Sequence, residues 1–380
     1  MKSFDVAVIG AGPAGTSAAY DLADAGLSVL ILEKKAMPRE KPCGGAISYS
    51  GQKFLRFDIP EDLVDAECFG ARINTPESSI TSITNDRLAI LVSRKNFDSY
   101  LLDMALNKGV AAVYEMAKEI KEDSGFYHIY TNANRYLAKN VIIATGIQST
   151  LIKNVRRLDN KDELGICLEA EIDINENSRY KDLKNIIEIH FGVAGYGYGW
   201  VFPHGNFLSI GVGGVTSVFK EPNKAMYEFM SKLGFKYDRK KIRGHMIPKG
   251  GIKRLTRKGG LFLVGDAAGF VEPFTGEGIA YAIRSGQIAA NTIIKAFKNS
   301  DFSEELLSNY EKICSAEIGS TMGYALFFSK MLHKFPNLLL NKIMSNQHCV
   351  DKYLEIISQK ITYKDYIKWI FKKLPKILIG

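Results

Sequence analysis

Hydrophobic positions along the chain form short apolar runs separated by glycine-rich turns, and the first runs define an N-terminal unit. Residues 6–9 are apolar and partly β-branched, which is typical of a buried parallel strand. Residues 16–25 are mostly small and predict a helix, Gly26 ends it, and residues 29–32 form a second apolar run. The pattern predicts a strand–helix–strand unit that begins a parallel sheet.

Three glycines follow the first strand in the spacing G-x-G-x-x-G: Gly10, Gly12 and Gly15. The first permits a tight turn, the second lets a pyrophosphate approach the backbone, and the third lets helix and strand pack closely. The helix N-terminus beyond them offers unpaired N–H groups and a positive dipole end. Glu33 ends the second strand about 20 residues later, where a carboxylate can accept both hydroxyls of an adenosine ribose. These features together predict a dinucleotide site.

Further apolar runs predict more of this sheet. Residues 88–92 form a short strand, and Ser93 is a suitable N-cap for the helix that follows. Arg94 lies in the first turn of that helix, where the dipole disfavours a cation, so we expect it to meet an anion such as a pyrophosphate. A surface arginine is the alternative.

Two β-rich segments, residues 110–117 and 126–131, predict strands of a sheet laid over the first, with Ala117 near the adenine. Residues 141–146, VIIATG, return the chain to the nucleotide-binding sheet.

The pattern changes between about residues 150 and 250, where residues 164–172 and 186–193 alternate as antiparallel strands do. Residues 194–206 form the most aromatic stretch of the chain and lead into another strand, residues 207–213. Tyr196, Tyr198 and Trp200 alternate, so a strand would place them on one face. The glycines between them favour an aromatic wall beside a pocket. Packing of a sheet on a helix is the alternative.

A second strand-and-turn pattern begins at residue 261. Residues 261–264 predict a buried strand ending at Asp266, and a loop with Pro273, Gly276 and Gly278 opens a helix over 279–295. The carboxylate can accept a sugar-alcohol hydroxyl, and the N–H groups at the helix start can face the anionic end of a reduced flavin. No second G-x-G-x-x-G follows a strand, so one long ligand held at both ends is expected, and FAD fits that description.

A glycine loop, Lys-Pro-Cys-Gly-Gly at residues 41–45, follows the first unit. Its bare backbone can lie against a flat ligand. An ordinary glycine turn with a chance cysteine is the alternative.

The composition indicates the class of protein and the cellular compartment. At 380 residues with 46% hydrophobic and 24% charged residues, the chain is long enough for two domains of a globular protein. No signal peptide or membrane-spanning run is visible, and the five cysteines lack metal or disulfide spacing, so we expect a cytoplasmic protein without a metal site.

The net charge of +9 is concentrated at the C-terminal end, where residues 321–380 contain ten lysines and three acidic residues. Within it, residues 363–380 predict an amphipathic helix that Pro375 ends, with Tyr363, Ile367, Ile370 and Leu374 on one stripe. We expect no nucleic acid as partner. Peripheral contact of this stripe with the inner face of the cell membrane is one hypothesis. Packing of the stripe onto its own domain is the alternative.

GAGPAG with Glu33, Arg94 and GDAAGFVEPFTGEGI resemble the flavoprotein group that includes p-hydroxybenzoate hydroxylase. KPCGG together with YGWVFP, residues 198–203, is similar to the geranylgeranyl reductase family within that group. The resemblance covers about residues 5–290. We expect an α/β fold (α+β overall) with a Rossmann-type FAD-binding domain (1–70, 88–150 and 251–300), an antiparallel-sheet substrate domain (71–87 and 151–250) and a helical C-terminal region (301–380).

The resemblance implies particular site residues. FAD would be bound by Gly10, Gly12, Pro13, Ala14, Gly15, Glu33, Cys43, Gly44, Ala46, Arg94, Ala117, Asp266, Gly278 and Ile279, and we add Lys34, Gly265, Pro273 and Gly276 from the same loops. The substrate pocket would contain Tyr196, Tyr198, Trp200, Phe202 and Pro203, and Cys43, Tyr198 and Trp200 would lie at the reacting atoms.

Three functions are compatible with these residues. The first is a reductase that saturates C=C bonds of isoprenoid chains, with aromatic faces stabilising cationic character on the alkene. The second is a flavin-dependent monooxygenase or halogenase, and a halogenase needs a lysine between flavin and substrate. The third is a flavin-dependent structural or membrane-interaction protein. No separate nicotinamide-binding unit is visible, so both NADPH and reduced ferredoxin are candidates for the electron donor.

Overall fold

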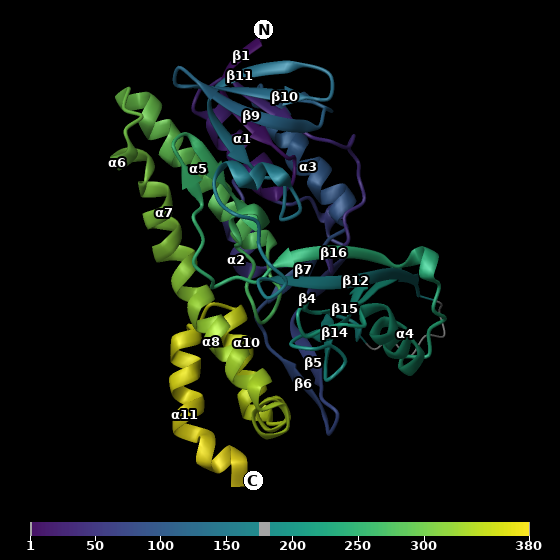
Figure 1. The fold of residues 1–380 in the computed structure, drawn as a ribbon. Coiled ribbons are helices and arrows are strands. Elements are labelled where there is room, and N and C mark those ends of the chain that lie inside the picture. Colours follow the sequence, from purple (N-terminus) through teal and green to yellow (C-terminus); the bar gives the residue numbers. More distant parts are fainter. Residues whose placement is uncertain (1, 175–182, 380) are drawn as a thin grey trace.

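The first layer of the computed structural model, which describes residues 2–174 and 183–379, is an eight-stranded sheet (Figure 1). Its strands are β1 (Lys2–Ile9), β2 (Val29–Leu32), β8 (Ala111–Val113), β9 (Ala117–Asp123), β10 (Phe126–Thr131), β11 (Arg135–Ile143), β17 (Arg257–Lys258) and β18 (Leu261–Leu263). The order is β17-β18-β11-β1-β2-β8, and the pairs β11–β18, β1–β11, β1–β2 and β2–β8 are parallel. The predicted strand–helix–strand start of a parallel sheet is confirmed.

The hairpin β9–β10 corrects one expectation. It does not form a sheet over the first, because β10 pairs with β11 in the same sheet. The reason is the length of β11: residues 135–138 pair with β10, and residues 141–143 pair with β18. The predicted strand over 110–117 is likewise wrong in extent, since β8 ends at Val113 and Ala117 begins β9.

Three helices cover this sheet: α1 (Pro13–Asp24), α3 (Arg94–Leu106) and α5 (Ile279–Asn299). Small residues let α1 and α5 approach each other closely. A Cβ at Gly286 would lie only 2.2 Å from the carbonyl oxygen of Ala14. Ala18 and Ala289 are fully buried in the same core. The alanine-rich composition of both helices therefore serves close helix packing.

The second layer is a seven-stranded sheet in the order β16-β12-β15-β14-β13-β5-β6. Its strands are β5 (Gly70–Asn74), β6 (Ser79–Ile83), β12 (Leu164–Asp173), β13 (Ile186–Phe191), β14 (Tyr198–His204), β15 (Phe207–Val215) and β16 (Arg243–Pro248). All pairs are antiparallel except β5–β13, so the predicted antiparallel strands are confirmed. Helix α4 (Pro222–Lys232) packs on β12 and β15.

A small antiparallel sheet, β3 (Ala46–Ser48), β7 (Ala89–Leu91) and β4 (Ala66–Cys68), lies between the large layers. Short helical segments complete this part: α2 (Tyr49–Phe54), η1 (Glu61–Leu63), η2 (Thr150–Asn154), η4 (Arg239–Lys241) and η5 (Gly265–Ala268).

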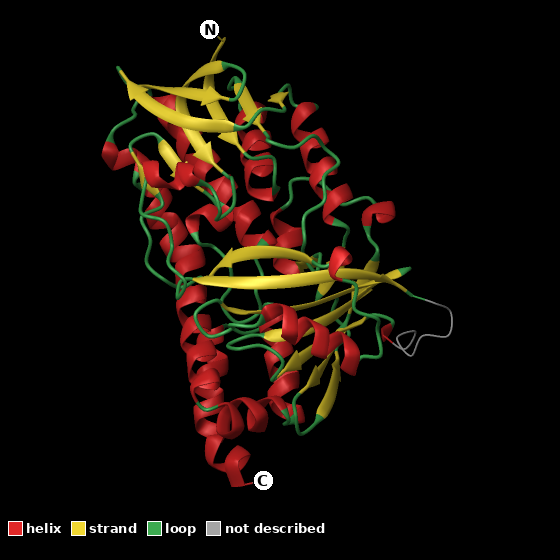
Figure 2. Ribbon diagram, turned by 45° about the vertical axis from the view of Figure 1, so that its right-hand side comes forward, coloured by secondary structure: helices red, strands yellow, loops and turns green. Residues whose placement is uncertain are grey.

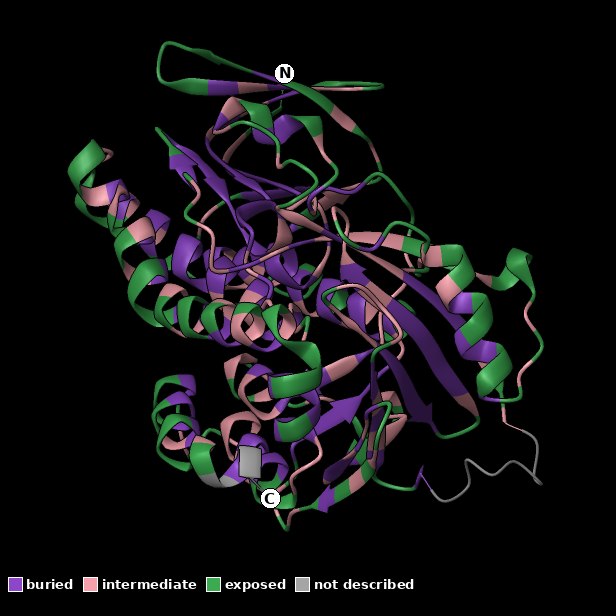
Figure 3. Cartoon of the chain, turned by 60° about the horizontal axis from the view of Figure 1, so that its bottom comes forward, coloured by how far each residue is buried: buried purple, intermediate pink, exposed green. Residues whose placement is uncertain are grey.

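Helices form the C-terminal part and run as a column beside both sheets (Figure 2). They are α6 (Glu304–Leu307), α7 (Asn309–Cys314), η6 (Ser315–Gly319), α8 (Ser320–Lys334), η7 (Pro336–Leu340), α9 (Asn341–Met344), α10 (Gln347–Ile357) and α11 (Tyr363–Ile379). Figure 3 shows the strands mostly buried and the outward faces of peripheral helices exposed.

Helix α11 corrects two expectations. It continues through Pro375 to Ile379, where Ile377 is buried in the same core as the apolar stripe, so packing of the last turn offsets the lost hydrogen bond and ring clash of an internal proline. Its apolar stripe is covered by protein: Tyr363, Ile367 and Ile370 are buried in one core that includes Phe328 of α8. The stripe therefore packs onto its own chain. No helix within residues 2–174 and 183–379 has the length and hydropathy needed to cross a bilayer.

Candidate cofactor and substrate site

In the glycine turn after β1, two glycines pack against backbone atoms and the third faces open space. A Cβ at Gly10 would lie 2.4 Å from the carbonyl oxygen of Ala144, and one at Gly15 would lie 2.0 Å from that of Gly10. Internal packing therefore requires glycine at positions 10 and 15. A Cβ at Gly12 would meet only Nη2 of Arg39, at 3.8 Å. The backbone at Gly12 is open where α1 begins, which fits the approach of a pyrophosphate.

Glu33 lies at the end of β2 with its carboxylate against this turn. Its Oε2 accepts a hydrogen bond from the backbone N–H of Ala11 at 2.9 Å, and Oε1 accepts one from Lys35 at 3.1 Å. The side chain is buried, whereas Lys34 is exposed. A buried carboxylate held beside the glycine turn fits a ribose-binding role.

Arg94 meets a different anion from the one expected. Its Nε and Nη2 donate to the two carboxylate oxygens of Asp98, both at 2.8 Å, and both side chains are buried. Arg39 lies 3.2 Å from the same carboxylate. The cation at the start of α3 is therefore satisfied within its own helix, four residues on. Its contact with a pyrophosphate stays a prediction.

A cavity of about 360 Å³ lies between the nucleotide-binding layer, the second sheet and the C-terminal helices. Many predicted cofactor residues line it: Pro13, Cys43, Gly44, Ala46, Arg94, Asp266, Pro273, Gly276, Gly278 and Ile279. The fold thus joins the cysteine loop, the strand end at Asp266 and the start of α5. The predicted residues Gly10, Gly12, Ala14, Gly15, Glu33, Lys34, Ala117 and Gly265 lie outside this lining.

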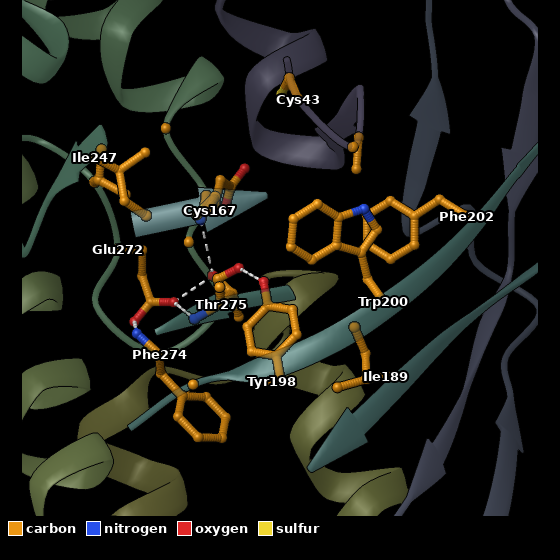
Figure 4. Close-up of a pocket in the computed structure, with 18 of the residues that line it drawn as sticks. Cys43, Cys167, Ile189, Tyr198, Trp200, Phe202, Ile247, Glu272, Phe274 and Thr275 are labelled. Atoms are coloured by element: carbon orange, nitrogen blue, oxygen red, sulfur yellow. Dashed lines mark hydrogen bonds between the residues drawn. The ribbon is translucent and has the colours of Figure 1, made fainter. Parts of the chain in front are cut away.

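Three aromatic side chains of β14 form one wall of the cavity, and two of them, Tyr198 and Trp200, are among the three that the alternation predicted (Figure 4). Tyr198, Trp200 and Phe202 follow at every second position, and Trp200 Nε1–H donates to Ser209 Oγ at 3.2 Å. Ser209 in turn donates to Glu169 Oε1 at 3.2 Å. The Tyr198 hydroxyl donates to the backbone carbonyl of Thr275. These bonds fix the positions of two of the three rings.

Two residues expected in the substrate pocket, Tyr196 and Pro203, lie off this wall. Tyr196 precedes β14 in a left-handed conformation (φ 50°), is 41% exposed and stacks on His333 of α8 with ring centroids 5.1 Å apart. It lines the edge of the cavity rather than the wall. Pro203 alternates to the other face of β14 and is not part of the lining. Tyr196 therefore lines the pocket as expected but does not share the face of Tyr198 and Trp200, and Pro203 lies outside the lining.

The room beside the indole comes from glycines other than those expected. A Cβ at Gly199 would lie 2.8 Å from the ring of Phe229 in α4, so this glycine permits packing on the opposite face. A Cβ at Gly211 of the neighbouring strand would lie 2.1 Å from Cζ2 of Trp200. Gly44 lies against Phe202, where a Cβ would come within 2.7 Å of the ring. The glycine loop therefore contacts the aromatic wall directly.

The remaining lining is largely apolar. It comes from β5, β13, the loop before α5, and α9 and α10, with the side chains Ile73, Ile189, Phe191, Phe274, Met344, Val350, Tyr353, Leu354 and Ile357. Most of these residues were not singled out from the sequence, because their packing together depends on the tertiary fold.

Buried ionisable groups also line the cavity. Burial raises the pKa of Glu277 to about 7. Burial and repulsion by Glu171 raise the pKa of Glu169 to about 7. Burial lowers the pKa of His245 to about 4, with a further contribution from Lys41. The cavity thus holds two carboxyl groups that carry a proton for much of the time near neutral pH. No local pattern indicated either one.

Fold and cavity together define an FAD-dependent oxidoreductase. Residues 7–156 match the family model described as pyridine nucleotide-disulphide oxidoreductase. The chain is 32% identical to the digeranylgeranylglycerophospholipid reductase of Methanocaldococcus jannaschii, over 99% of this chain and 96% of that protein. It is 31% identical to an uncharacterized protein of Methanosarcina barkeri, over 100% and 96% of the two chains.

Among solved structures, a geranylgeranyl bacteriochlorophyll reductase-like protein from Thermoplasma acidophilum has a TM-score of 0.83 at 24% identity, covering 99% of this chain and 98% of that one. A flavin-dependent brominase has a TM-score of 0.73 at 17% identity, covering 99% and 100%, so halogenases share the fold. The chain belongs to the geranylgeranyl reductase family of FAD-dependent oxidoreductases.

Proposed function

We propose that this protein saturates C=C bonds in isoprenoid chains of the geranylgeranyl type, carried by lipids or related prenyl compounds. The observation that carries the proposal is the continuity of the cavity. One cavity is lined both by the cysteine loop and Asp266 and by apolar side chains such as Ile189 and Leu354. The name of the Methanocaldococcus jannaschii relative supports a prenyl-lipid substrate.

FAD in its reduced form would supply a hydride to one alkene carbon. The open backbone at Gly12 and the buried Glu33 carboxylate would hold its nucleotide end, and Asp266, Gly278 and the cysteine loop would surround the other end. Cys43 lies in that loop and lines the cavity, where its Sγ accepts the N–H of Gly45 at 3.4 Å. We assign Cys43 to positioning beside the reacting atoms.

The aromatic wall would stabilise positive charge that develops on the alkene, because the faces of Trp and Tyr attract cations. Trp200 is suited to this role since its N–H is already bound by Ser209. Its ring is therefore fixed. The hydroxyl of Tyr198 is engaged by the Thr275 carbonyl, and its pKa is raised by burial, so it stays neutral.

Glu277 is the best placed residue to hold the proton for the second alkene carbon. Its Oε1 is buried and has no hydrogen-bond partner among the described residues. Ser48 contacts the Glu277 carboxyl, and Ser48 Oγ lies 2.9 Å from Ser50 Oγ. Because Ser50 is partly exposed, the two hydroxyls form a short path by which solvent can return a proton.

The electron donor is part of the same proposal. Either NADPH or reduced ferredoxin would reduce the flavin. The family match and the cavity are compatible with both donors. Because a prenyl lipid resides in a bilayer, we further propose that the protein is cytoplasmic and works at the inner face of the cell membrane.

The halogenase alternative has one feature in its favour. Lys41 lines the cavity, and burial followed by repulsion from Arg94 lowers its pKa. A lysine between flavin and substrate is what a halogenase requires. The chemistry of the products separates the two functions.

The decisive experiment uses the purified protein with its flavin chemically reduced under anaerobic conditions. Addition of detergent-dispersed geranylgeranyl lipid should reoxidise the flavin and raise the mass of the lipid in steps of two hydrogens. A parallel reaction with O₂ and bromide tests for halogenated or hydroxylated product. A protein that takes up no flavin, or that forms only the oxygen-dependent product, refutes the reductase assignment.

A further inference from the structure

The outward side of α8 and η7 exposes a line of large apolar side chains, which we call the α8 face. Three of its members, Tyr324, Phe327 and the half-buried Met331, lie on α8 at intervals of three or four positions, so they share one side of that helix. Phe335 follows at the end of α8, and Leu338 lies in η7. Phe327, Phe335 and Leu338 are 49%, 49% and 53% exposed. A line of exposed aromatic residues at helical spacing indicates an interaction surface.

The chain segment that carries the α8 face has lysines and no acidic residue, although Glu77 of another segment accepts a hydrogen bond from Asn341. Residues 318–350 contain no Asp or Glu, and they include Lys330, Lys334 and Lys342. All three lysines are exposed, and the first two lie on α8 itself. The surface therefore combines apolar bulk with a cationic flank, which is the composition of an element that lies in a bilayer interface.

The α8 face adjoins the edge of the cavity. Tyr196, which lines the cavity, stacks on His333 of α8. Lys249 also lines the cavity, and after burial the largest cause that lowers its pKa is repulsion by Lys330. One edge of the substrate cavity is thus formed beside the helix that carries the exposed aromatic side chains.

We propose that the α8 face docks this protein on a bilayer that contains anionic lipids, with the Tyr196–Lys249 edge of the cavity turned toward the lipid headgroups. Phe327 and Phe335 enter the boundary between headgroups and acyl chains, and Lys330 and Lys334 lie against the phosphates. The cavity edge then faces the substrate. The proposal deepens the proposed function because it rests on a prenyl lipid as substrate. It also replaces α11, whose apolar stripe is buried, as the docking element.

Vesicle flotation of the full chain tests the docking surface. Wild-type protein should float with vesicles of phosphatidylcholine and phosphatidylglycerol, and less with phosphatidylcholine alone. The double variant Phe327→Ser, Phe335→Ser should reduce binding about tenfold or more, since two aromatic anchors are lost. Lys330→Glu with Lys334→Glu should abolish the preference for anionic vesicles.

The matched control replaces two exposed aromatic residues elsewhere, Phe126 in β10 (39% exposed) and Tyr227 in α4 (55% exposed), with serine. This control should float like wild type. A second comparison, Phe371→Ser with Lys372→Glu on the exposed side of α11, should also keep its binding. If wild type does not bind anionic vesicles, or if only the α11 variant loses binding, the α8 face is not the docking surface.

Turnover of detergent-dispersed prenyl lipid separates this proposal from the function itself. The Phe327→Ser, Phe335→Ser variant should retain its FAD and its turnover in detergent while it loses turnover on vesicle-embedded lipid. Equal loss in both assays would overturn the docking role. Absence of turnover by the wild-type protein in detergent would refute the reductase function. The flotation assay would still decide whether the α8 face binds vesicles.

Discussion

At the scale of single residues, Glu277 is distinguished by its buried Oε1, which has no hydrogen-bond partner among the described residues. Glu272, by contrast, accepts hydrogen bonds from the N–H groups of Phe274 and Thr275 at 3.0 and 2.6 Å. A carboxyl group with one buried oxygen free of hydrogen bonds and a pKa raised to about 7 can release a proton at little cost near neutral pH. Glu272 is held as a structural acceptor within its loop.

Glu277→Gln should therefore lower alkene reduction about a hundredfold or more while FAD content stays unchanged, because amide cannot supply the proton. In wild type, the rate should fall as pH rises through about 7, and the variant should lack this dependence. Pre-steady-state flavin reoxidation at several pH values measures both effects. Glu169→Gln serves as the comparison, and a larger loss in that variant would move the proton donor to Glu169.

Glu169 predicts a pH dependence of stability. Its pKa rises from 4.5 to about 7 on folding, so the folded chain binds more protons than the unfolded chain between these pH values. This contribution to stability is present below pH 4.5 and is lost as pH rises through about 7. Glu169→Gln, which retains an acceptor for Ser209, should raise the free energy of unfolding by at most about 3 kcal/mol above pH 7 and have no effect at pH 4. Urea unfolding at pH 4 and pH 8 measures this, and equal effects at both pH values would contradict it.

At the scale of elements, the fit of β14 against β15 depends on Gly211. A Cβ there would lie 2.1 Å from Trp200 Cζ2 and 2.5 Å from the carbonyl oxygen of Leu168. Gly211→Ala should displace the indole, destabilise the protein by about 1–3 kcal/mol and shift the tryptophan emission. Urea unfolding and fluorescence check this.

Gly323→Ala is the matched control for that substitution. Its Cβ would meet nothing within 4 Å on α8, so alanine should stabilise the helix by up to about 1 kcal/mol. If Gly211→Ala unfolds and fluoresces like wild type, the indole does not occupy the position described.

The glycine turn, strand β14 and the buried ionisable residues show how far the sequence predicts the site. The G-x-G-x-x-G unit and the alternation of Tyr196, Tyr198 and Trp200 are local patterns, and the structure has the glycine turn and places Tyr198 and Trp200, with Phe202, on one face of β14. The alternation in the sequence starts at Tyr196, two residues before β14 begins, so the sequence alone places Tyr196 on the strand. Glu169 and Glu277 were missed since their burial comes from distant segments. The pairing of Arg94 with Asp98, four residues on, is a spacing at which helical side chains pair, and a contact of Arg94 with a pyrophosphate stays a prediction.

At the scale of the whole molecule, the C-terminal helices belong to the core that borders the cavity. Tyr366 and Ile370 of α11 are fully buried with Phe328 of α8 and with Tyr353 of α10, which itself lines the cavity. Removal of α11 would uncover several large side chains, each worth about 3–5 kcal/mol when lost from a core. That loss is comparable with the whole stability of a typical domain.

A chain ending at Thr362 should therefore unfold at a markedly lower temperature and bind a hydrophobic dye before the transition. Thermal unfolding followed by circular dichroism, with dye fluorescence, tests this. The control is Phe371→Ser, which changes an α11 residue that is 50% exposed and should leave the unfolding temperature unchanged. A truncated chain that melts like the full chain would show that α11 contributes little to the core.

The cavity lining has one more consequence. The cysteine loop, Asp266 and the start of α5 come from the layer that carries the glycine turn, whereas Val350, Tyr353 and Leu354 come from a single C-terminal helix, α10. Under the proposed function, α10 supplies one part of the hydrocarbon end from a stretch of sequence separate from the cofactor loops. Substitutions in α10 can remodel the hydrocarbon end without altering a residue of the cofactor loops. Such modularity gives evolution, or an engineer, a way to change the length of prenyl chain accepted while the electron-transfer centre stays intact.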